Sequence, residues 1–349
     1  MSKHSEQLNF SEKILSWFKK HGRHSLPWQV NATPYRVWLS EVMLQQTQVS
    51  TVLAYFDRFT QKFPTIQHLA QAAQDDVLFL WSGLGYYSRA RNLHKCAKII
   101  QEQYHGEWPM DVALLEKLPG IGRSTAGAIV SLSKDYFAPI LDGNVKRVLC
   151  RFFAIETPVE KQLWEKAEQL TSKSYPKNYN QAMMDLGATV CTRTKPRCPD
   201  CPLQENCTAY AQEKSGVRLA QEYPKKKSKP VLPVIYKQFL LLSPKEKPAL
   251  WLYKRPPVGI WAGLWSLPEL EMEENATSWL TQKGFHVLNV QPLPAIKHNF
   301  SHFTLHLHPI HILVEEQNSL IEENNSGFFS LEKPWPGGLA APIHLTSAF

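Results

Sequence analysis

Four cysteines close together in the sequence have the clearest metal-binding chemistry. Cys191, Cys198, Cys201 and Cys207 are near enough along the chain for one loop to surround a soft metal centre with four thiolates. A zinc site more often has two separated Cys-x2-Cys pairs, whereas here one such pair is flanked by single cysteines. The spacing therefore favours an iron-sulfur cluster over zinc and leaves both open.

The other features of the chain indicate a reducing compartment. The N-terminal sequence, MSKHSEQLNF, is polar and lacks the apolar stretch of a secretory signal, and no apolar run approaches the roughly 20 residues that span a bilayer. We therefore expect a cytoplasmic protein without a membrane partner, whose thiols bind metal rather than form disulfides. Cys96 and Cys150 are isolated and are expected in the core.

Two carboxylates are candidates for acid-base chemistry. Helical spacing places Glu41 on an apolar stripe with Val37, Trp38, Leu44, Gln45 and Gln48. Burial there would raise the pKa of Glu41 and suit it to donate a proton, although a glutamate in a stripe can also be a paired structural group. Asp142 precedes a helix that carries Lys146, Arg147 and Arg151, and it could either act in catalysis or simply cap that helix.

A third segment has the pattern of a phosphate-binding hairpin. Residues 118–128, LPGIGRSTAGA, contain a Gly-x-Gly turn at Gly120 and Gly122 between two segments of helical spacing. The unpaired N–H groups at the start of the second helix can bind a phosphate without distinguishing the base sequence. Such a turn is weak support by itself, because many helix connections use glycine for left-handed backbone angles.

The distribution of charge fits a polyanionic partner for the first part of the chain. Residues 1–230 hold 31 Lys+Arg against 21 Asp+Glu, whereas residues 231–349 hold 8 against 10. Within the cysteine loop, Arg193, Lys195 and Arg197 can present cations to phosphate as well. A basic body joined to a near-neutral module is typical of a nucleic-acid-binding protein, although a generic basic protein has the same composition.

The chain should contain a helical part followed by a smaller α+β part. Helical spacing of apolar residues covers Phe10–Phe18, Val37–Val49, Val52–Phe59, Val77–Trp81 and Thr125–Leu132. The lysine- and proline-rich segment 223–230 has the composition of an exposed linker. Beyond it, residues 234–242, residues 249–253 and the alternating stretch from Phe303 predict strands, and one helix is expected at 277–283.

Several segments in combination are specific for one family. They are Leu26–Trp28, the Glu41 helix, Gly83–Tyr87, the hairpin, the Asp142 segment, Asn180–Gly187 and the cysteine loop. Together they resemble the helix-hairpin-helix glycosylase superfamily and, closely, adenine-specific mismatch glycosylases of the MutY type. The resemblance covers nearly the whole chain and implies a mainly α glycosylase region over 1–222, with a six-helix hairpin subdomain at about 30–138. It further implies an iron-sulfur subdomain from 1–29 and 139–222, and a Nudix-like domain over 231–349.

The resemblance also implies an activity and a cofactor. In this family the cysteine loop holds one 4Fe-4S cluster, and the enzyme is a base-excision repair hydrolase that flips adenine out of double-stranded DNA when it is mispaired with 8-oxoguanine or guanine. Glu41 would protonate the departing adenine and later activate water, and Asp142 would stabilise the oxocarbenium sugar, with help from Asn144 and Ser124. Lyase-active relatives have a lysine at the position of Ser124, so serine implies base removal without strand cleavage.

The resemblance assigns further residues to the DNA and to the base pocket. Gln45 and Tyr86 would fill or wedge the base stack. The remaining expected DNA contacts are Gln46, Arg89, Gly120, Gly122, Lys146 and Arg147. Leu26, Trp28 and Asp185 would shape or support the base pocket. We expect a monomer associated with the bacterial nucleoid.

The last part of the chain resembles a Nudix-like domain that recognises a lesion and does not hydrolyse nucleotides. Its signature is residues 256–268, PPVGIWAGLWSLP, but Glu271, Glu273 and Glu274 lack the spacing that collects magnesium. Phe300 would pack, while Ser301 and His302 would form hydrogen bonds to 8-oxoguanine. Alternating histidines at 298, 302, 306, 308 and 311 could suggest zinc, but they more often form the polar face of a strand.

Two other functions compete with this one. A glycosylase of the same fold that acts on oxidised pyrimidines is disfavoured by Ser124 and by the segment Phe300–His302. A non-catalytic iron-sulfur protein that binds DNA damage is disfavoured by the presence of both Glu41 and Asp142.

Overall fold

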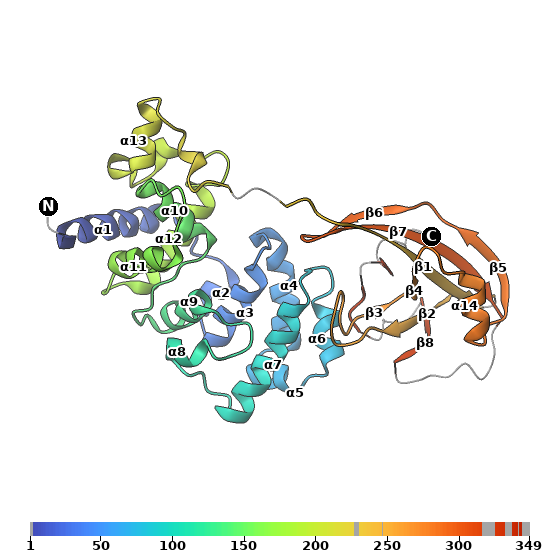
Figure 1. Ribbon diagram of the computed structural model, residues 1–349. Helices are drawn as coiled ribbons and strands as arrows, with labels where there is room; N and C mark the ends of the chain where they lie inside the picture. Colours follow the sequence, from blue (N-terminus) through green and yellow to red (C-terminus); the bar gives the residue numbers. More distant parts are fainter. Residues whose placement is uncertain are drawn as a thin grey trace. The chain divides into compact units, whose positions relative to one another are not determined.

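The computed structural model describes residues 3–226, 230–245, 247–315, 325–331, 337–340 and 342–343, with side chains from Asn9 onward. The chain forms two compact units, shown in Figure 1 and described here one at a time. The first unit comprises residues 1–71 and 92–228, and the second comprises residues 72–91 and 229–349.

The first unit is helical, which confirms the expectation for this part of the chain. Its helices are α1 (Lys3–His21), α2 (Pro27–Val30), α3 (Pro34–Leu44), α4 (Val49–Lys62), α5 (Ile66–Gln71), most of α7 (Ser88–Gln103), α8 (Val112–Leu115), α9 (Arg123–Lys134), α10 (Gly143–Phe152), α11 (Glu160–Leu170), α12 (Pro176–Thr189) and α13 (Thr208–Lys214). Short 3-10 turns lie at Cys198–Asp200, Gln204–Asn206 and Ala220–Glu222. No helix in the described part of the chain is long and apolar enough to cross a membrane.

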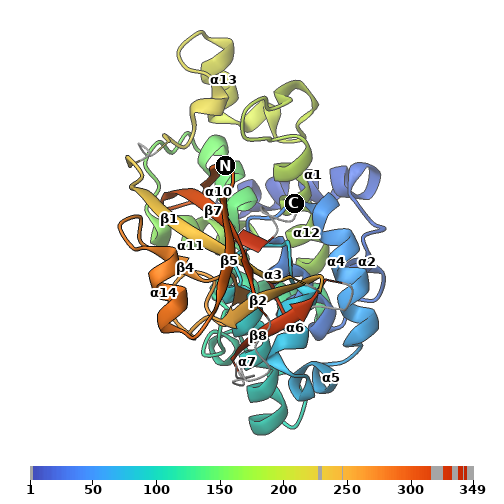
Figure 2. The same cartoon turned by 90° about the vertical axis from the view of Figure 1, so that its right-hand side faces the viewer.

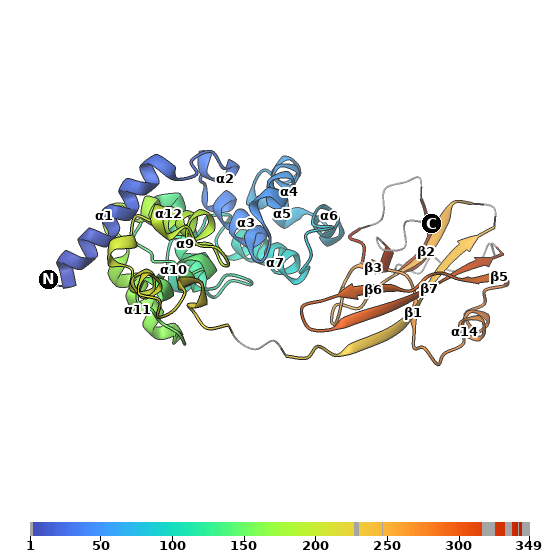
Figure 3. The same cartoon turned by 90° about the horizontal axis from the view of Figure 1, so that it is seen from above.

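The core of the first unit holds α3 and α10 in place around α9 and α12. Trp38 and Met43 of α3 are fully buried, as is Phe56 of α4, so α3 is packed along its length. Helix α9 approaches the chain after it so closely that a Cβ on Gly127 would lie 2.4 Å from the Pro139 carbonyl oxygen. Figure 3 shows α9, α10 and α12 side by side, in agreement with their contacts. The segments that carry Glu41 and Asp142 are therefore rigid.

The expected helix over Val37–Val49 was wrong in its extent. Helix α3 ends at Leu44, and α4 begins only at Val49. Between them, Gln46 has a left-handed backbone (φ 57°), and the Thr47 N–H donates to the Leu44 carbonyl at 3.2 Å. The intervening glutamines and threonine are polar and bring no apolar group to the core, so tertiary packing does not favour continuing the helix.

The second unit is built around two sheets. Its elements are α6 (Gln74–Leu80), the start of α7, β1 (Val234–Pro244), β2 (Ala249–Lys254), β3 (Trp265–Ser266), β4 (Glu269–Leu270), α14 (Ala276–Gln282), β5 (Val287–Pro292), β6 (Ile296–Asn299), β7 (Thr304–Val314) and β8 (Ser326–Ser330). The larger sheet has the order β4-β1-β7-β5, with β6 also paired to β7, and the smaller has the order β3-β2-β8. Strands β1 and β7 are parallel over their whole length, whereas their other neighbours are antiparallel. Figure 2 shows α14 to one side of these strands and β2 and β8 to the other.

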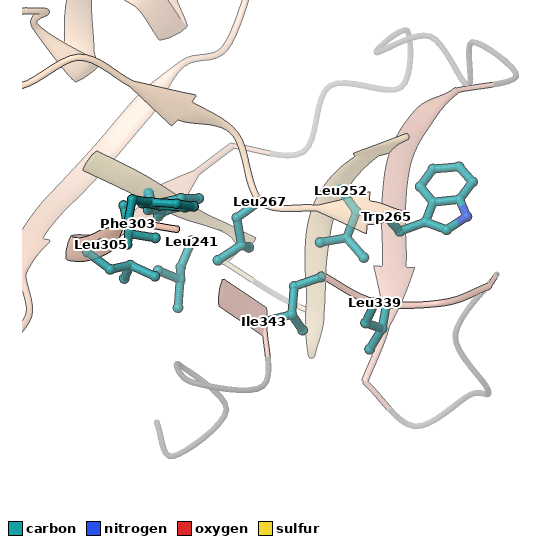
Figure 4. Close-up of a cluster of buried hydrophobic side chains, with 10 residues drawn as sticks. Leu241, Leu252, Trp265, Leu267, Phe303, Leu305, Leu339 and Ile343 are labelled. Carbon is teal, nitrogen blue, oxygen red and sulfur yellow. The ribbon is translucent and has the colours of Figure 1, made fainter. Parts of the chain in front are cut away.

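Alternation along β1 builds a core on each face of the larger sheet. Phe239 and Leu241 pack towards β2, β3 and Phe303, in the cluster drawn in Figure 4. Leu240 and Leu242 face the other way and pack on Leu280 of α14. The sheet therefore lies between α14 and the smaller sheet. This confirms the expected α+β module and the helix near residues 277–283.

Residues 72–91 pack within this second unit. Lys254 forms an ion pair with Asp75 at 2.7 Å, and the Tyr87 hydroxyl donates to the Leu339 carbonyl at 3.3 Å. Arg91 donates from Nη1 to the Ala262 carbonyl at 2.8 Å. The linker composition at 223–230 did not predict that this helical segment would associate with the strands.

Candidate active site

Asp142 is fixed by three hydrogen bonds at the N-terminus of α10. Its Oδ1 accepts from the backbone N–H of Asn144 at 3.1 Å and of Val145 at 2.8 Å, and its Oδ2 accepts from Nδ2 of Asn144 at 3.0 Å. Asp142 is therefore the N-cap of α10, as the alternative interpretation of the sequence held. Capping does not exclude catalysis, because the same bonds hold a partly exposed carboxylate in one orientation.

A chain of contacts links this carboxylate to the cysteine loop. Arg147 donates from Nη2 to Oδ1 of Asn144 at 2.8 Å and to the Gly187 carbonyl at 2.6 Å. Its Nε donates to the Cys191 carbonyl at 2.8 Å. A Cβ on Gly187 would lie 2.6 Å from Cβ of Asn144, so only glycine lets α12 come this close. Arg147 thus fixes the amide of Asn144, which in turn orients Asp142.

Ser124 also serves this arrangement. It lies in the first turn of α9, and its Oγ accepts the backbone N–H of Leu141 at 3.0 Å. That bond ties the residue before Asp142 to the helix that follows the hairpin. We refer to Ser124, Asp142, Asn144 and Arg147 as the Asp142 site.

Glu41 has a carboxyl group that stays protonated at neutral pH. Part of the residue is accessible to solvent, but protein atoms surround the carboxyl closely, and this desolvation raises the pKa of Glu41 to about 8. The negative charge of Asp142 contributes in the same direction. A carboxyl group with a raised pKa beside a second carboxylate can act as a proton donor, while the second can stabilise positive charge.

A cavity of about 140 Å³ lies next to the Glu41 helix, and its lining includes Ser40, the residue before Glu41, together with Trp28 and Arg23. Asp185 is completely buried and does not line the cavity, but it accepts from Nε and Nη2 of Arg23 at 2.9 and 2.6 Å. Of the three residues expected to shape a base pocket, Trp28 lines this cavity, and Asp185 binds Arg23, which lines it too. Leu26 is only the N-cap of α2.

Sequence analysis missed Arg23. A signal was available, because an aspartate in the middle of an apolar helix such as α12 needs a cationic or hydrogen-bonding partner when it is buried. Arg23 lies three residues before the Leu26–Trp28 segment and was a candidate partner for Asp185. Choosing it required the knowledge that this segment and α12 are neighbours in the fold.

The hairpin has the geometry expected for binding phosphate. Gly120 has a φ of 77°, and a Cβ there would lie 3.0 Å from Cβ of Asn92, so this position requires glycine. Gly122 is the exposed N-cap of α9 and has no side chain to bond the first N–H groups of that helix. Among the described residues no side chain caps these N–H groups, so they can donate to an acceptor such as a phosphate oxygen.

The glutamines expected to enter the base stack lie in the turn between α3 and α4. Gln45 is the C-cap of α3, and Gln46 is exposed with a left-handed backbone (φ 57°). A non-glycine residue in this conformation is uncommon and often marks a functional turn.

Tyr86, in the second unit, has a similar backbone, with a φ of 50°, and its side chain is exposed. The buried Arg89 supports this loop, because Nη2 donates to the carbonyls of Leu84 and Gly85 at 3.2 Å each. The Arg89 guanidinium also lies over the rings of Trp81 and Tyr86. Burial lowers the pKa of Arg89 to about 10. Arg89 thus shapes the loop that presents Tyr86.

The cations of α10 are engaged within the protein. Lys146 forms an ion pair with Glu160 at 3.1 Å, and the guanidinium of Arg147 is used in the contacts to Asn144 and Cys191. Their expected role as DNA ligands stays a prediction, and the structure adds a positioning role for Arg147.

The four cysteines surround one pocket, which Arg151 also lines. Arg151 donates from Nη1 to Sγ of Cys191 at 3.3 Å, and Sγ of Cys207, at the start of α13, lies 3.6 Å from the Arg151 carbonyl, to which it donates. A cation beside sulfur stabilises a thiolate ligand. These residues therefore fit a thiolate-bound metal centre.

Within the described part of the chain, no group of three or more His, Cys, Asp or Glu side chains is placed closely enough to hold one metal ion. Four cysteine thiolates can bind either one zinc ion, with all four ligands at about 2.3 Å, or an iron-sulfur cluster, in which each thiolate binds a different iron. Burial raises the pKa of Cys198 to about 11 and that of Cys201 to about 12, so a metal must displace their protons.

In the second unit, residues 300–303 form a tight turn that we call the Phe300 turn. The N–H of Phe300 donates to the carbonyl of Phe303 at 2.8 Å, and the two rings stack with centroids 4.4 Å apart. Ser301 and His302 are exposed, and within the described residues their side chains make one polar contact, with each other, at 3.4 Å. They are free to bond an external group.

Several acidic and histidine residues of this unit have structural partners. Glu271 pairs with Lys237, and the Glu274 carboxylate accepts the N–H of Glu271 at 2.7 Å. Along β7, His306 packs on Tyr236 and His311 contacts the Ser243 hydroxyl at 2.7 Å.

Family models match both parts of the chain. A superfamily of helix-hairpin-helix base excision DNA repair proteins matches residues 39–173, and the NUDIX domain matches residues 239–345. Among solved structures, a thermostable thymine-DNA glycosylase aligns with a TM-score of 0.56 at 26% identity, over 60% of this chain and 98% of that one.

Relatives extend over both parts. The chain is 42% identical to an adenine DNA glycosylase of Buchnera aphidicola from Acyrthosiphon pisum, over 96% of this chain and 95% of that protein. It is 36% identical to the adenine DNA glycosylase of Mus musculus, over 85% of this chain and 69% of the mouse protein.

Proposed function

Because the chain belongs to the adenine DNA glycosylases, which are base-excision repair hydrolases, we propose that it releases adenine mispaired with 8-oxoguanine or guanine in double-stranded DNA. One observation carries the mechanism. A carboxyl group that is protonated at neutral pH, Glu41, lies near a carboxylate that hydrogen bonds hold in place, Asp142. The flipped adenine would have to lie against Glu41 and Asp142, whereas the cavity lined by Trp28 and Arg23 has neither of them in its lining.

The two carboxyl groups have different roles in the reaction. Glu41 protonates the leaving adenine, which makes it a better leaving group. Asp142 stabilises the positive charge that develops on the sugar, with a transient covalent bond to the sugar as in retaining glycosidases. Glu41, deprotonated by the first step, then takes a proton from a water molecule as the water oxygen attacks the sugar carbon and breaks its bond to Asp142. Asn144, Arg147 and Ser124 contribute by holding Asp142 in position.

We further propose that the enzyme is monofunctional. Schiff-base chemistry needs an amine nucleophile, and Ser124 has only a hydroxyl, which already accepts the Leu141 N–H. The test is borohydride trapping during normal turnover. Efficient formation of a covalent DNA adduct, with strand scission as fast as adenine release, would contradict the proposal.

We assign one 4Fe-4S cluster to Cys191, Cys198, Cys201 and Cys207. The common pocket and the Arg151 guanidinium beside Cys191 support this assignment. When bound, the cluster would supply a covalent cross-link for a loop that carries Arg193, Lys195 and Arg197 towards the DNA. Purified protein should be brown and hold about four irons per chain, whereas a colourless protein loaded with one zinc would overturn the assignment.

We propose that the Phe300 turn recognises the base opposite adenine, with Ser301 and His302 as hydrogen-bonding groups. Their exposure and the absence of strong partners within the described residues support this role. The enzyme would act as a cytoplasmic monomer on nucleoid DNA.

The decisive experiment is a panel of duplexes, each with a single adenine opposite 8-oxoguanine, guanine, cytosine or thymine. Adenine release and strand scission are measured separately under single-turnover conditions. Release from the first two duplexes without scission is expected. A non-catalytic damage-binding protein would bind the panel without releasing adenine, and a pyrimidine-specific relative would act only on oxidised thymine or cytosine.

A further inference from the structure

A strained tryptophan lies in the turn that precedes β3. Trp261 has a φ of 55°, in the left-handed region that a bulky side chain rarely adopts. The flanking residues Gly259 and Gly263 also have positive φ values, of 89° and 72°, but glycine tolerates them. Such a conformation persists where the surroundings determine it strongly, and it often marks a functional position.

The backbone on both sides of Trp261 is fixed by arginines. Arg255 donates from Nε to the carbonyl of Ile260 at 2.9 Å, and its Nη1 is paired with Glu269 at 2.7 Å. Arg91 donates to the carbonyl of Ala262 at 2.8 Å. The Arg255 guanidinium also lies 5.4 Å from the centroid of the Trp261 ring. These contacts hold both the strained backbone and the direction of the ring.

The ring of Trp261 lies between the core and the Phe300 turn. Its centroid is 5.5 Å from that of Phe300 in an edge-on arrangement, and 6.3 Å from that of Phe239, which is fully buried in β1. Phe300 is held on its other sides by Phe303, which stacks on it, and by His298 at 4.5 Å. Trp261 is therefore the one contact of Phe300, among these three, that comes from outside the β6-β7 hairpin.

We propose that Trp261 is a positioning residue for the Phe300 turn, which fixes where Ser301 and His302 meet the base opposite adenine and so sets the preference for 8-oxoguanine over guanine. This inference rests on the proposed recognition role of that turn. In the Phe300 turn the exposed polar side chains of Ser301 and His302 stand on packed aromatic rings. A shift of the Phe300 ring would therefore move both side chains without unfolding the sheet. Trp261 touches no reacting atom.

The left-handed backbone makes a sharp test possible. Trp261→Phe keeps a ring beside Phe300, and Trp261→Ala removes the ring but keeps the unfavourable φ. Trp261→Gly removes the ring and also relieves the backbone, because glycine adopts this φ freely. Positioning and stability are thereby separated.

The measurements are the melting temperature and the single-turnover rate of adenine release opposite 8-oxoguanine and opposite guanine. We expect Trp261→Ala and Trp261→Gly to lower the ratio of the two rates by about tenfold, mainly through a slower reaction opposite 8-oxoguanine. Trp261→Phe should recover most of the ratio. Trp261→Gly should melt at a higher temperature than Trp261→Ala yet discriminate no better.

A second readout follows the turn directly. The imidazole NMR signals of His302 should shift in Trp261→Ala and return towards their original positions in Trp261→Phe. In a double-mutant cycle with His302→Ala, the effects on the rate ratio should not add, because both variants act on the same contact to the base.

Three results would overturn the inference. Equal losses on both duplexes that follow the melting temperature would show a purely structural role. An unchanged ratio in Trp261→Gly, when Ser301→Ala and His302→Ala lower it, would refute the role of Trp261 and leave recognition by the turn intact. An unchanged ratio in Ser301→Ala and His302→Ala would remove the proposed recognition role and this inference with it.

Discussion

The Asp142 site and the Phe300 turn are built in opposite ways. At the Asp142 site, both carboxylate oxygens accept hydrogen bonds, and the groups that donate them are themselves held by Arg147. At the Phe300 turn, the fixed parts are aromatic rings and one backbone hydrogen bond, while Ser301 and His302 are exposed. The polar groups of the Asp142 site are hydrogen-bonded to one another, whereas Ser301 and His302 of the Phe300 turn are exposed to solvent.

The difference follows from what each region has to do. Stabilising a developing charge requires donors and acceptors that are already oriented, so that no reorganisation is needed during the reaction. Recognising a base requires free donors and acceptors, and the rigidity must then come from apolar packing underneath. The comparison predicts large effects on rate at the first region and smaller effects on preference at the second.

The largest effect is expected at Glu41. Glu41→Gln keeps the shape of the side chain but cannot donate a proton to adenine, so the rate of adenine release should fall by about 10² to 10⁴. Binding to the mispaired duplex should persist. The measurement is single-turnover adenine release together with a binding titration.

Glu41→Gln should also change how the melting temperature depends on pH. The pKa of Glu41 is raised in the folded state, so ionising it opposes folding, and its contribution to stability decreases as pH rises from its ordinary pKa towards about 8. Glu41→Gln should therefore melt at a higher temperature than the original protein at pH 8, and the difference should shrink towards pH 5. A release rate within threefold of the original would refute the acid role.

The next largest effect should come from Arg147, which supports Asp142 from a distance. Arg147→Lys cannot bridge Asn144, Gly187 and Cys191 together, and misorientation of Asp142 should slow adenine release by about 10²-fold. The loss should appear in the chemical step on both 8-oxoguanine and guanine duplexes. Lys146→Met is the comparison variant on α10: it removes an expected DNA contact and the ion pair with Glu160 but no contact to Asn144, so it should weaken DNA binding and leave the chemical step unchanged. A loss confined to DNA affinity would make Arg147 a phosphate ligand instead.

The pH dependence should separate the two regions. Glu41 donates only when protonated, so adenine release should be constant up to pH of about 8 and fall about tenfold per pH unit above it. The preference for 8-oxoguanine should not follow this titration, because Glu41 does not contact the opposite base. If the rate of adenine release already began to fall near pH 5, the carboxyl group of Glu41 would not be desolvated.

The smallest effect should come from the exposed tips. Ser301→Ala and His302→Ala each remove one hydrogen-bonding group and should lower the preference for 8-oxoguanine over guanine by about tenfold or less. The rate of adenine release opposite guanine should barely change. The duplex panel measures both, and Thr304→Val is a neighbouring control. A large loss on both duplexes would mean that the turn supports the fold rather than recognition.

Much of the architecture could be predicted because its signals are local. Apolar spacing predicted the helices around Glu41 and after the hairpin, residues 234–242 had a strand-like composition that predicted β1, and alternation predicted β7. The end of α3 at Leu44 could not be predicted, since it depends on which side chains find a place in the core. The sequence singled out Asp142 either as a catalytic group or as a helix cap. The structure shows that it caps α10 and that its charge also raises the pKa of Glu41.

The sequence alone determined the chemistry that is available: four thiols in one loop, one carboxyl group within a helix and another at the start of a helix, and a glycine hairpin. The tertiary structure decided how these groups behave. Arg23 and Asp185 are 162 residues apart, and Arg91 and Ala262 are 171 apart, so no local pattern contains these pairs. The raised pKa of Glu41 likewise comes from desolvation by surrounding segments and from the charge of Asp142. Burial and long-range contacts determine electrostatics, and they exist only once the chain has folded.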